Sequence, residues 1–218
     1  MHSFTEENYL KAIYHLSKED GSVVTTNGIA EVINTKAASV TDMLKKLAEK
    51  KLINYLKYQG ATLTPSGRQT ATRIIRKHRL WEVFLVEKLF FKWDEVHEIA
   101  EELEHINSSD LIERLDKFLG YPTIDPHGDP IPDSKGKIQQ KSLIKINHMK
   151  PGQQGKISGV TEHSTVFLQY LEKSGLTLEA SIKIVEIMEF DGSIILQINN
   201  GKEISISREV AKNLLVVL

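Results

Sequence analysis

The spacing of apolar residues divides this chain at a segment rich in proline. Through most of the first 120 residues, apolar side chains recur three or four positions apart, which is typical of amphipathic helices. From residue 142 onward they alternate over short segments, which is typical of β-strands. The segment 120–132 holds four prolines and must form a stiff, irregular loop. Because 218 residues exceed the usual size of one domain, we expect more than one domain. The two kinds of apolar spacing predict a mainly α-helical front part and a separate small β-barrel.

The first 64 residues contain the parts of a winged helix-turn-helix. Thr5 is expected to cap a first helix, and Thr26 to cap a short helix that follows a break at Asp20-Gly21. The elements predicted next are a turn at 34–36, a helix over 38–51, and strands over 52–56 and 58–64. In a fold with this order of elements, the third helix would enter the major groove of DNA.

The third helix and the hairpin have the composition of a DNA-binding surface. Small residues at the start of the helix would let its backbone approach the bases, and lysines farther along would meet phosphates. Between Lys36 and Arg79 the chain has eleven basic and only two acidic residues, although its net charge is -1. The alternative is a small helical core whose lysines are simply solvated. The candidate DNA-binding residues are Thr26, Lys36, Ala38, Ser39, Thr41, Lys45, Lys57 and Tyr58.

The segment 97–105, with the sequence HEIAEELEH, carries four potential metal ligands. On a continuous helix, offsets of four, seven and eight residues would bring all four into an arc of roughly 100°. These four residues are His97, Glu101, Glu104 and His105. His78 and Glu82 offer a second pair one turn apart, and the absence of cysteine restricts any metal to nitrogen and oxygen ligands. The alternative is a solvated acidic helix face, which would need no histidines placed off the apolar stripe.

The middle of the chain also predicts a subunit interface. A long helix should run from residue 64 to about residue 80 or beyond, and Ser108-Ser109-Asp110 should cap another helix that ends at Gly120. The apolar run over 81–91 exceeds what one helix face of a small domain can bury, so we expect a homodimer. No apolar run approaches a membrane span and no signal peptide is recognisable, which predicts a cytoplasmic protein without a membrane partner.

The C-terminal part predicts a small β-barrel after a polar linker over residues 133–141. A helix is expected over 165–173, between the strands. Strands are predicted over 142–146, 155–160, 181–188, 193–198 and 203–207, with hairpin turns at 191–192 and 199–201.

Several motifs in order resemble the diphtheria-toxin-repressor family of metal-dependent transcriptional regulators. They are YLKAIY (9–14), LTPSG (63–67), RKHRLWE (76–82), HEIAEELEH (97–105) and DPHGDPIP (125–132), followed by an SH3-like module. The resemblance covers nearly the whole chain. It implies a winged helix-turn-helix DNA-binding domain over 1–72, a helical metal-binding and dimerisation domain over 73–140, and an SH3-like, FeoA-type domain over 141–218.

The resemblance also implies two metal sites. The primary, activating site would use Asn8, Glu101, Glu104 and His105. The second site would use His78, Glu82 and His97. Further candidate ligands are Asp125, His127, Glu162 and His163, which we rank lower because an exposed loop carboxylate is usually only solvated.

The resemblance implies that the metal is manganese or iron. Glu101 follows the pattern of manganese-responsive members, whereas Asn8 departs from both the manganese and the iron pattern. Lys11 stands where some manganese sensors have a further glutamate. Mn²⁺ is therefore expected because of Glu101, with Fe²⁺ as the alternative because of Asn8 and Lys11, and other divalent ions could bind in vitro.

The expected protein is a dimeric repressor that binds palindromic operators of metal-uptake genes in double-stranded DNA, with the metal as corepressor. One rival is a metalloenzyme with a dinuclear His/Glu site, but the chain shows neither a nucleophile motif nor the repeated Glu-x-x-His of ferritin-like bundles. The other rival is a winged-helix DNA-binding protein without a metal response.

Overall fold

The computed structural model describes residues 3–17, 21–139 and 142–218. They fall into two compact units, which we describe separately. Unit 1 comprises residues 1–78, 101–113 and 132–138, and unit 2 comprises residues 79–100, 114–131 and 139–218. Among the described residues, none of the helices is both long enough and apolar enough to cross a membrane.

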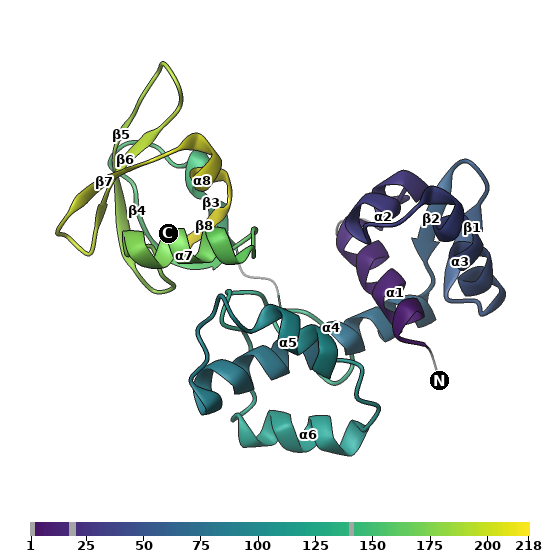
Figure 1. The fold of residues 1–218 in the computed structure, drawn as a ribbon. Coiled ribbons are helices and arrows are strands. Elements are labelled where there is room, and N and C mark those ends of the chain that lie inside the picture. The colour runs from purple at the N-terminus through teal and green to yellow at the C-terminus, as the bar shows by residue number, and fades with distance from the viewer. Residues whose placement is uncertain (1–2, 18–20, 140–141) are drawn as a thin grey trace. The chain divides into compact units, whose positions relative to one another are not determined.

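Unit 1 begins with the predicted winged helix-turn-helix (Figure 1). Its elements are α1 (Phe4–Leu16), α2 (Thr26–Val32), α3 (Ala37–Glu49), β1 (Ile53–Leu56) and β2 (Gly60–Leu63), followed by the start of α4 (Pro65–Leu89). Apolar residues of α1, α2 and α3 close one core, which includes the fully buried Leu10, Ile29 and Leu44. The predicted fold of this region is confirmed.

Both predicted helix caps in this region are wrong by one or two positions. Ser3, not Thr5, caps α1: its hydroxyl accepts the Glu6 N–H, and the Glu6 carboxylate accepts the Ser3 N–H. Thr25, not Thr26, caps α2 by accepting the Gly28 N–H. In both cases the capping residue has the extended backbone that a cap requires, while the predicted residue already belongs to the first turn. Asp20, in the predicted break, lies outside the described residues, and Gly21 has a left-handed backbone.

The β1–β2 hairpin forms the wing. Its antiparallel register runs from Ile53 opposite Leu63 to Leu56 opposite Gly60. Gly60 has a φ of 121° and lies so close to the Val24 carbonyl oxygen that a Cβ would overlap it. This glycine therefore holds the wing against the strand-like segment before α2, where Val24 pairs with Ala61.

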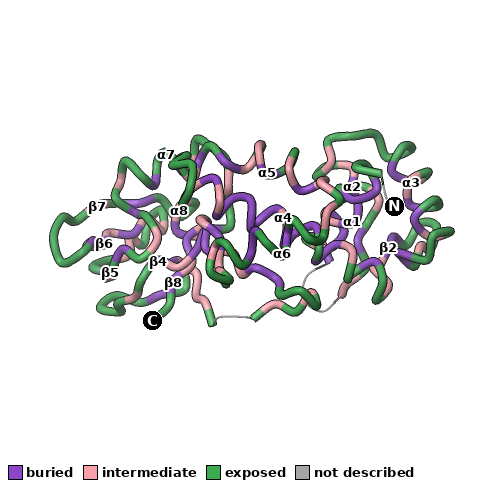
Figure 2. The backbone as a smooth tube through the Cα atoms, turned by 90° about the horizontal axis from the view of Figure 1, so that it is seen from below, coloured by how far each residue is buried: buried purple, intermediate pink, exposed green. Residues whose placement is uncertain are grey.

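The helices after the wing differ from the sequence prediction in length. Helix α4 continues to Leu89, well beyond residue 80, and most of its residues between 71 and 85 are buried (Figure 2). Helix α5 (His97–Leu103) ends before Glu104, and α6 (Ser109–Phe118) begins after Ser108, which accepts the Leu111 N–H as predicted. Leu89, Phe90 and Phe91 are exposed, and the homodimer stays a prediction.

Unit 2 contains the six-stranded sheet of the C-terminal module, in which every strand pair is antiparallel. The order is β3-β8-β4-β5-β6-β7, and Figure 1 shows the curled strands with α7 beside them. The elements are β3 (Ile144–Lys145), the 3₁₀ helix η1 (Ile146–His148), β4 (Gln154–Val160), α7 (Thr165–Ser174), β5 (Ser181–Ile187), β6 (Ile194–Ile198), β7 (Glu203–Ile206), α8 (Arg208–Lys212) and β8 (Leu214–Val217).

The five strands and the helix predicted for this module are present, and the predicted hairpin turns have left-handed residues at Gly192, Asn199 and Asn200. The prediction missed α8 and β8. The sequence LLVV of β8 lacks the alternation of a half-buried strand, and β8 lies between β3 and β4 inside the sheet. Of the predicted linker, residues 140–141 lie outside the described residues, and Asp133 accepts the N–H groups of Lys135 and Lys137 in a turn.

Candidate functional site

The predicted ligand helix ends in the middle of the ligand motif. His97 and Glu101 lie on α5, but Glu104 and His105 lie in a turn after Leu103. The expectation that all four ligands share one helical face is therefore wrong. The chain turns at this point because Glu104 and His105 each pair with residues of other elements in unit 1.

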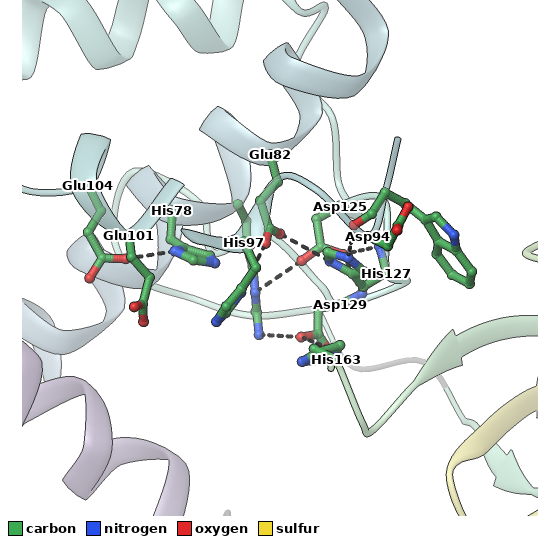
Figure 3. Close-up of polar contacts among 12 residues, drawn as sticks. His78, Glu82, Asp94, His97, Glu101, Glu104, Asp125, His127, Asp129 and His163 are labelled. Carbon is green, nitrogen blue, oxygen red and sulfur yellow. Dashed lines mark hydrogen bonds and ion pairs between the residues drawn. The ribbon is translucent and has the colours of Figure 1, made fainter. Parts of the chain in front are cut away.

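Glu104 is the most buried acidic residue of the site, with a side chain that is 0% exposed. Its Oε2 lies 2.7 Å from His78 Nδ1, and its two oxygens accept hydrogen bonds of 2.7 and 2.9 Å from the Lys11 ammonium (Figure 3 shows the His78 contact). Burial alone would raise the pKa of Glu104, but His78 and Lys11 lower it below its ordinary value. Glu104 is therefore an ionised carboxylate that depends on positive charge.

Lys11 of α1 joins the two carboxylates of the motif. Besides its bonds to Glu104, its ammonium lies 3.1 Å from Glu101 Oε1. The two acids differ in exposure, since the Glu101 side chain is 49% exposed and that of Glu104 is not exposed at all. One ammonium thus occupies the space between two predicted ligands.

His105 pairs with a residue that the sequence analysis missed. Its Nδ1 lies 2.6 Å from Glu7 Oε2, and its ring stacks on Phe4 at 4.5 Å between centroids. Glu7 is buried on α1, whereas Asn8 beside it is exposed. The spacing of Glu7 and Lys11, one helical turn apart, is the only local signal that both face the same site.

Unit 2 gathers a second group of ligands around Glu82 of α4. This buried carboxylate has Oε1 3.4 Å from His97 Nδ1 and Oε2 3.3 Å from His127 Nδ1 (Figure 3). The ligand atoms of Glu82, Asp125 and His127 all lie within 4.8 Å of one another, so the three could hold a metal ion. His78 precedes Glu82 by one turn of the same helix.

Asp125 and His127 are buried, which contradicts the expectation that they belong to an exposed loop. They are only 4% and 2% exposed. His127 Nε2 lies 2.8 Å from the Trp93 carbonyl oxygen, and the His127 carbonyl oxygen accepts the Val160 N–H from β4. Gly128 permits this packing, because a Cβ there would overlap the Ser158 carbonyl oxygen.

The charges around this loop compensate one another only in part. Arg79 Nη2 lies 3.1 Å from Asp129 Oδ2, and Arg79 Nε lies 3.5 Å from Asp125 Oδ2. Burial, with the nearby charges of Asp129 and Glu82, raises the pKa of Asp125 to about 7 despite Arg79. Burial lowers the pKa of His127, but Glu82 outweighs this effect and raises it overall. This group of acids therefore favours an added cation.

Of the two candidates in the C-terminal module, His163 lies with this group. Its ring centroid is 5.0 Å from that of His127 and 6.3 Å from that of His97, and its Nε2 is 3.9 Å from Asp129 Oδ2. Glu162 is exposed, and its carboxylate accepts the Ser164 N–H instead.

The candidate DNA-binding residues occupy α2, α3 and the wing. Thr26 and Thr41 are half-buried, and the Thr41 hydroxyl donates to the Ala37 carbonyl oxygen. Tyr58 at the wing tip is 92% exposed, and the Lys57 ammonium lies 4.9 Å from its ring centroid. The exposed members of the set are Lys36, Ala38, Ser39, Lys45, Lys57 and Tyr58.

The donor set suits a hard or borderline divalent ion. Carboxylate oxygens and imidazole nitrogens are ligands for Mn²⁺, Fe²⁺ and Zn²⁺, and cysteine is absent from the chain. The fully buried Glu104 carboxylate, already paired with an ammonium, is the observation that best fits a cation site.

Three family profiles match consecutive parts of the chain. Residues 1–61 match the N-terminal DNA binding domain of iron dependent repressors, and residues 64–133 match their metal binding and dimerisation domain. Residues 144–218 match the FeoA domain.

Individual proteins agree with these profiles. An HTH-type transcriptional regulator of Methanocaldococcus jannaschii is 39% identical over 113 residues, covering 52% of this chain and 90% of the relative. The diphtheria toxin repressor of Corynebacterium diphtheriae is 28% identical over 215 residues, covering 95% of this chain and 94% of the relative. A solved manganese-dependent transcriptional repressor in complex with manganese is 34% identical with a TM-score of 0.89, covering 97% of this chain and 99% of that one.

Proposed function

The chain belongs to the diphtheria toxin repressor family of metal-dependent transcriptional regulators, and we propose that it represses metal-uptake genes when a divalent metal is plentiful. Family members are transcriptional repressors and not enzymes. The proposed protein is a cytoplasmic homodimer that binds palindromic operators in double-stranded DNA. Its proposed domains are 1–72 for DNA binding, 73–140 for metal binding and dimerisation, and 141–218 as the SH3-like domain.

The pairing of Glu104 with α1 carries this proposal. Helix α1 belongs to the winged helix-turn-helix, and its residues Glu7 and Lys11 contact His105 and Glu104 of the ligand motif within unit 1. A metal ion that changes these contacts would therefore act directly on the DNA-binding fold.

We assign the primary site to Asn8, Glu101, Glu104 and His105. A bound divalent ion would supply the positive charge that holds these oxygen and nitrogen donors together. The chain's own part is to bring two carboxylates and an imidazole to the side of α1 and to bury one of them completely. Operator affinity would rise only insofar as the DNA-binding arrangement holds the ion more tightly than other arrangements do.

We assign the second site to His78, Glu82 and His97. The contact of Glu82 with His97 and the one-turn spacing of His78 and Glu82 support this set. Asp125 and His127 are further candidates because their ligand atoms lie within 4.8 Å of that of Glu82, and His163 is another because its ring centroid lies 5.0 Å from that of His127. Glu162 is the weakest candidate because it is exposed.

Manganese is the proposed ion, with iron(II) as the alternative. Glu101 offers a hard oxygen donor at a position where iron-responsive members have a softer ligand, and a relative solved with manganese shares this fold. Iron remains the alternative because iron-dependent repressors such as IdeR of Mycobacterium tuberculosis are 37% identical over 128 residues, covering 59% of this chain and 55% of the relative.

The proposal is tested by operator binding with and without metal. A duplex would be selected from random DNA in the presence of Mn²⁺, and its affinity measured by fluorescence anisotropy at matched free Mn²⁺, Fe²⁺, Zn²⁺ and Co²⁺. We expect tight binding with Mn²⁺ or Fe²⁺ and only weak, salt-sensitive binding with a chelator. Equal affinity for the same duplex with chelator and with Mn²⁺ would show that the protein is a DNA-binding protein without a metal response.

A further inference from the structure

Lys11 holds the carboxylate oxygens that the proposed function assigns to the primary metal. Its ammonium lies 2.7 and 2.9 Å from the two oxygens of Glu104 and 3.1 Å from Glu101 Oε1. The Lys11 side chain is only 15% exposed, and that of Glu104 is not exposed. These are short, charge-assisted hydrogen bonds, and the two to Glu104 are largely removed from water.

An ammonium and a divalent ion cannot both occupy this space. Protein oxygens bind small divalent ions at about 2.0–2.6 Å. The Lys11 ammonium already lies at hydrogen-bond distance from the same carboxylate oxygens, so an ion bound to them would lie against it. Two positive charges this close repel strongly where water does not screen them. Metal binding to Glu101 and Glu104 therefore requires the ammonium to leave.

We propose that Lys11 is a tethered cation that competes with the divalent metal for Glu101 and Glu104, and so sets the metal concentration at which the protein responds. The inference rests on the proposed function, because it concerns the same primary site. It adds Lys11, a residue that does not bind the metal and whose positive charge opposes metal binding.

The competition has a second consequence for the metal-free protein. Without metal, Lys11 supplies the positive charge that keeps the buried Glu104 carboxylate paired and ties α1 to the turn after α5. A lysine stem is flexible, with several rotatable bonds, so the ammonium can withdraw toward solvent without a change in the helix backbone. Metal binding thus replaces the Lys11 ammonium by a cation of higher charge.

The experiment compares full-length variants by isothermal titration with Mn²⁺. Lys11→Met keeps the length of the stem and removes the charge, Lys11→Gln is a more polar substitute, and Lys11→Arg keeps the charge. We expect the two neutral variants to bind Mn²⁺ at least about tenfold more tightly than the wild type, because a charge-assisted bond no longer has to be broken. Lys11→Arg should stay close to the wild type.

The matched control is Lys212→Gln, which removes the ammonium from an exposed pair with Glu209 at 2.9 Å in the C-terminal module. It should leave Mn²⁺ affinity unchanged. Melting temperatures provide the second measurement: Lys11→Met should melt lower than the wild type in chelator, where Glu104 has lost the Lys11 ammonium and keeps only its contact with His78, and should gain more than the wild type when Mn²⁺ is added.

Unchanged or weaker Mn²⁺ binding in both neutral variants, with circular dichroism showing folded protein, would overturn the competition while leaving metal-dependent operator binding of the wild type intact. If the wild type itself bound no metal yet still bound its operator, the proposed function would fail, and this inference with it.

Discussion

Glu6 Oε1 of α1 lies 2.7 Å from the Lys50 ammonium at the end of α3, in a pair whose acidic side chain is 1% exposed. Lys46, one turn earlier on α3, approaches the same oxygen at 3.2 Å. The next residue of α1, Glu7, pairs instead with His105 of the ligand motif. Two adjacent carboxylates therefore connect α1 to the proposed recognition helix and to the proposed metal site.

The Glu6 pair should make stability depend on pH. Burial would raise the pKa of Glu6, but Lys50, the Ser3 N–H and Lys46 together lower it from 4.5 to about 2. The lowered pKa means that the ionised Glu6 carboxylate stabilises the fold at neutral pH, and this contribution is lost as the pH falls from about 4.5 to about 2. Urea unfolding of Glu6→Gln should show a deficit of about 1–3 kcal/mol at pH 7 that shrinks below pH 4.5.

The control for this prediction is Asp42→Asn. Asp42 pairs with Lys45 at 3.1 Å on the same helix, but both side chains are exposed, so its loss should change stability by less than about 1 kcal/mol. A deficit of Glu6→Gln that stayed constant down to pH 3 would show that its cause is packing and not charge.

Glu104→Gln should abolish the metal response. The substitution keeps the volume but removes the buried charge that Lys11 or a metal would pair with, so the dissociation constant for Mn²⁺ should rise by more than about a hundredfold. Operator binding measured by anisotropy should then be equally weak with Mn²⁺ and with chelator. Glu102→Gln is the matched control, because Glu102 is an exposed neighbour on α5, and it should respond like the wild type.

Glu82→Gln should remove the second ion and spare the first. Glu82 is the carboxylate that both His97 and His127 approach, so a neutral amide would weaken every proposed ligand set of that site. Equilibrium dialysis with metal analysis of Glu82→Gln and of Glu98→Gln, which changes an exposed glutamate next to His97, should show reduced stoichiometry only in the former. The same loss in both variants would argue against a defined second site.

The winged helix-turn-helix was readable from the sequence because it depends on local signals. Apolar spacing, the hairpin and the turn residues all lie within 64 positions and agree with one another. The ends of the elements could be predicted less well. Helix α5 stops at Leu103, although Glu104 and His105 continue its helical pattern without a glycine or proline. Contacts of Glu104 with Lys11 and of His105 with Glu7 determine that end, and their partners are more than 90 positions away.

Distant contacts also explain the misjudged loop. Asp125 and His127 stand among prolines and polar residues, which predicts exposure, yet both are buried. Their burial depends on the close approach of Gly128 to Ser158 and on the hydrogen bond from His127 to Trp93. Neither contact leaves a periodic signal in the sequence.

The exposed apolar end of α4 should support the homodimer. Phe90 is 87% exposed, and Phe90→Asp should produce monomers in sedimentation velocity at micromolar concentration. Its φ of 60° suits Asp better than Phe, so the substitution should not strain the backbone. Phe190→Asp changes an even more exposed phenylalanine in the C-terminal module and should leave the dimer intact. Dimers in both variants would mean that the interface lies elsewhere.

The last prediction concerns the wing and the recognition helix. Lys45 and Lys57 are exposed, and if each meets a phosphate, each neutral variant should lower operator affinity and reduce the slope of log affinity against log salt by about one. Ser39→Ala, at the start of α3, should instead change the preferred sequence with little effect on the slope, because that position is proposed to face bases. Lys202→Gln in the C-terminal module provides the matched loss of an exposed charge. An equal change of slope in Lys202→Gln and Lys57→Gln would show a general charge effect and would contradict the proposal that the wing binds DNA.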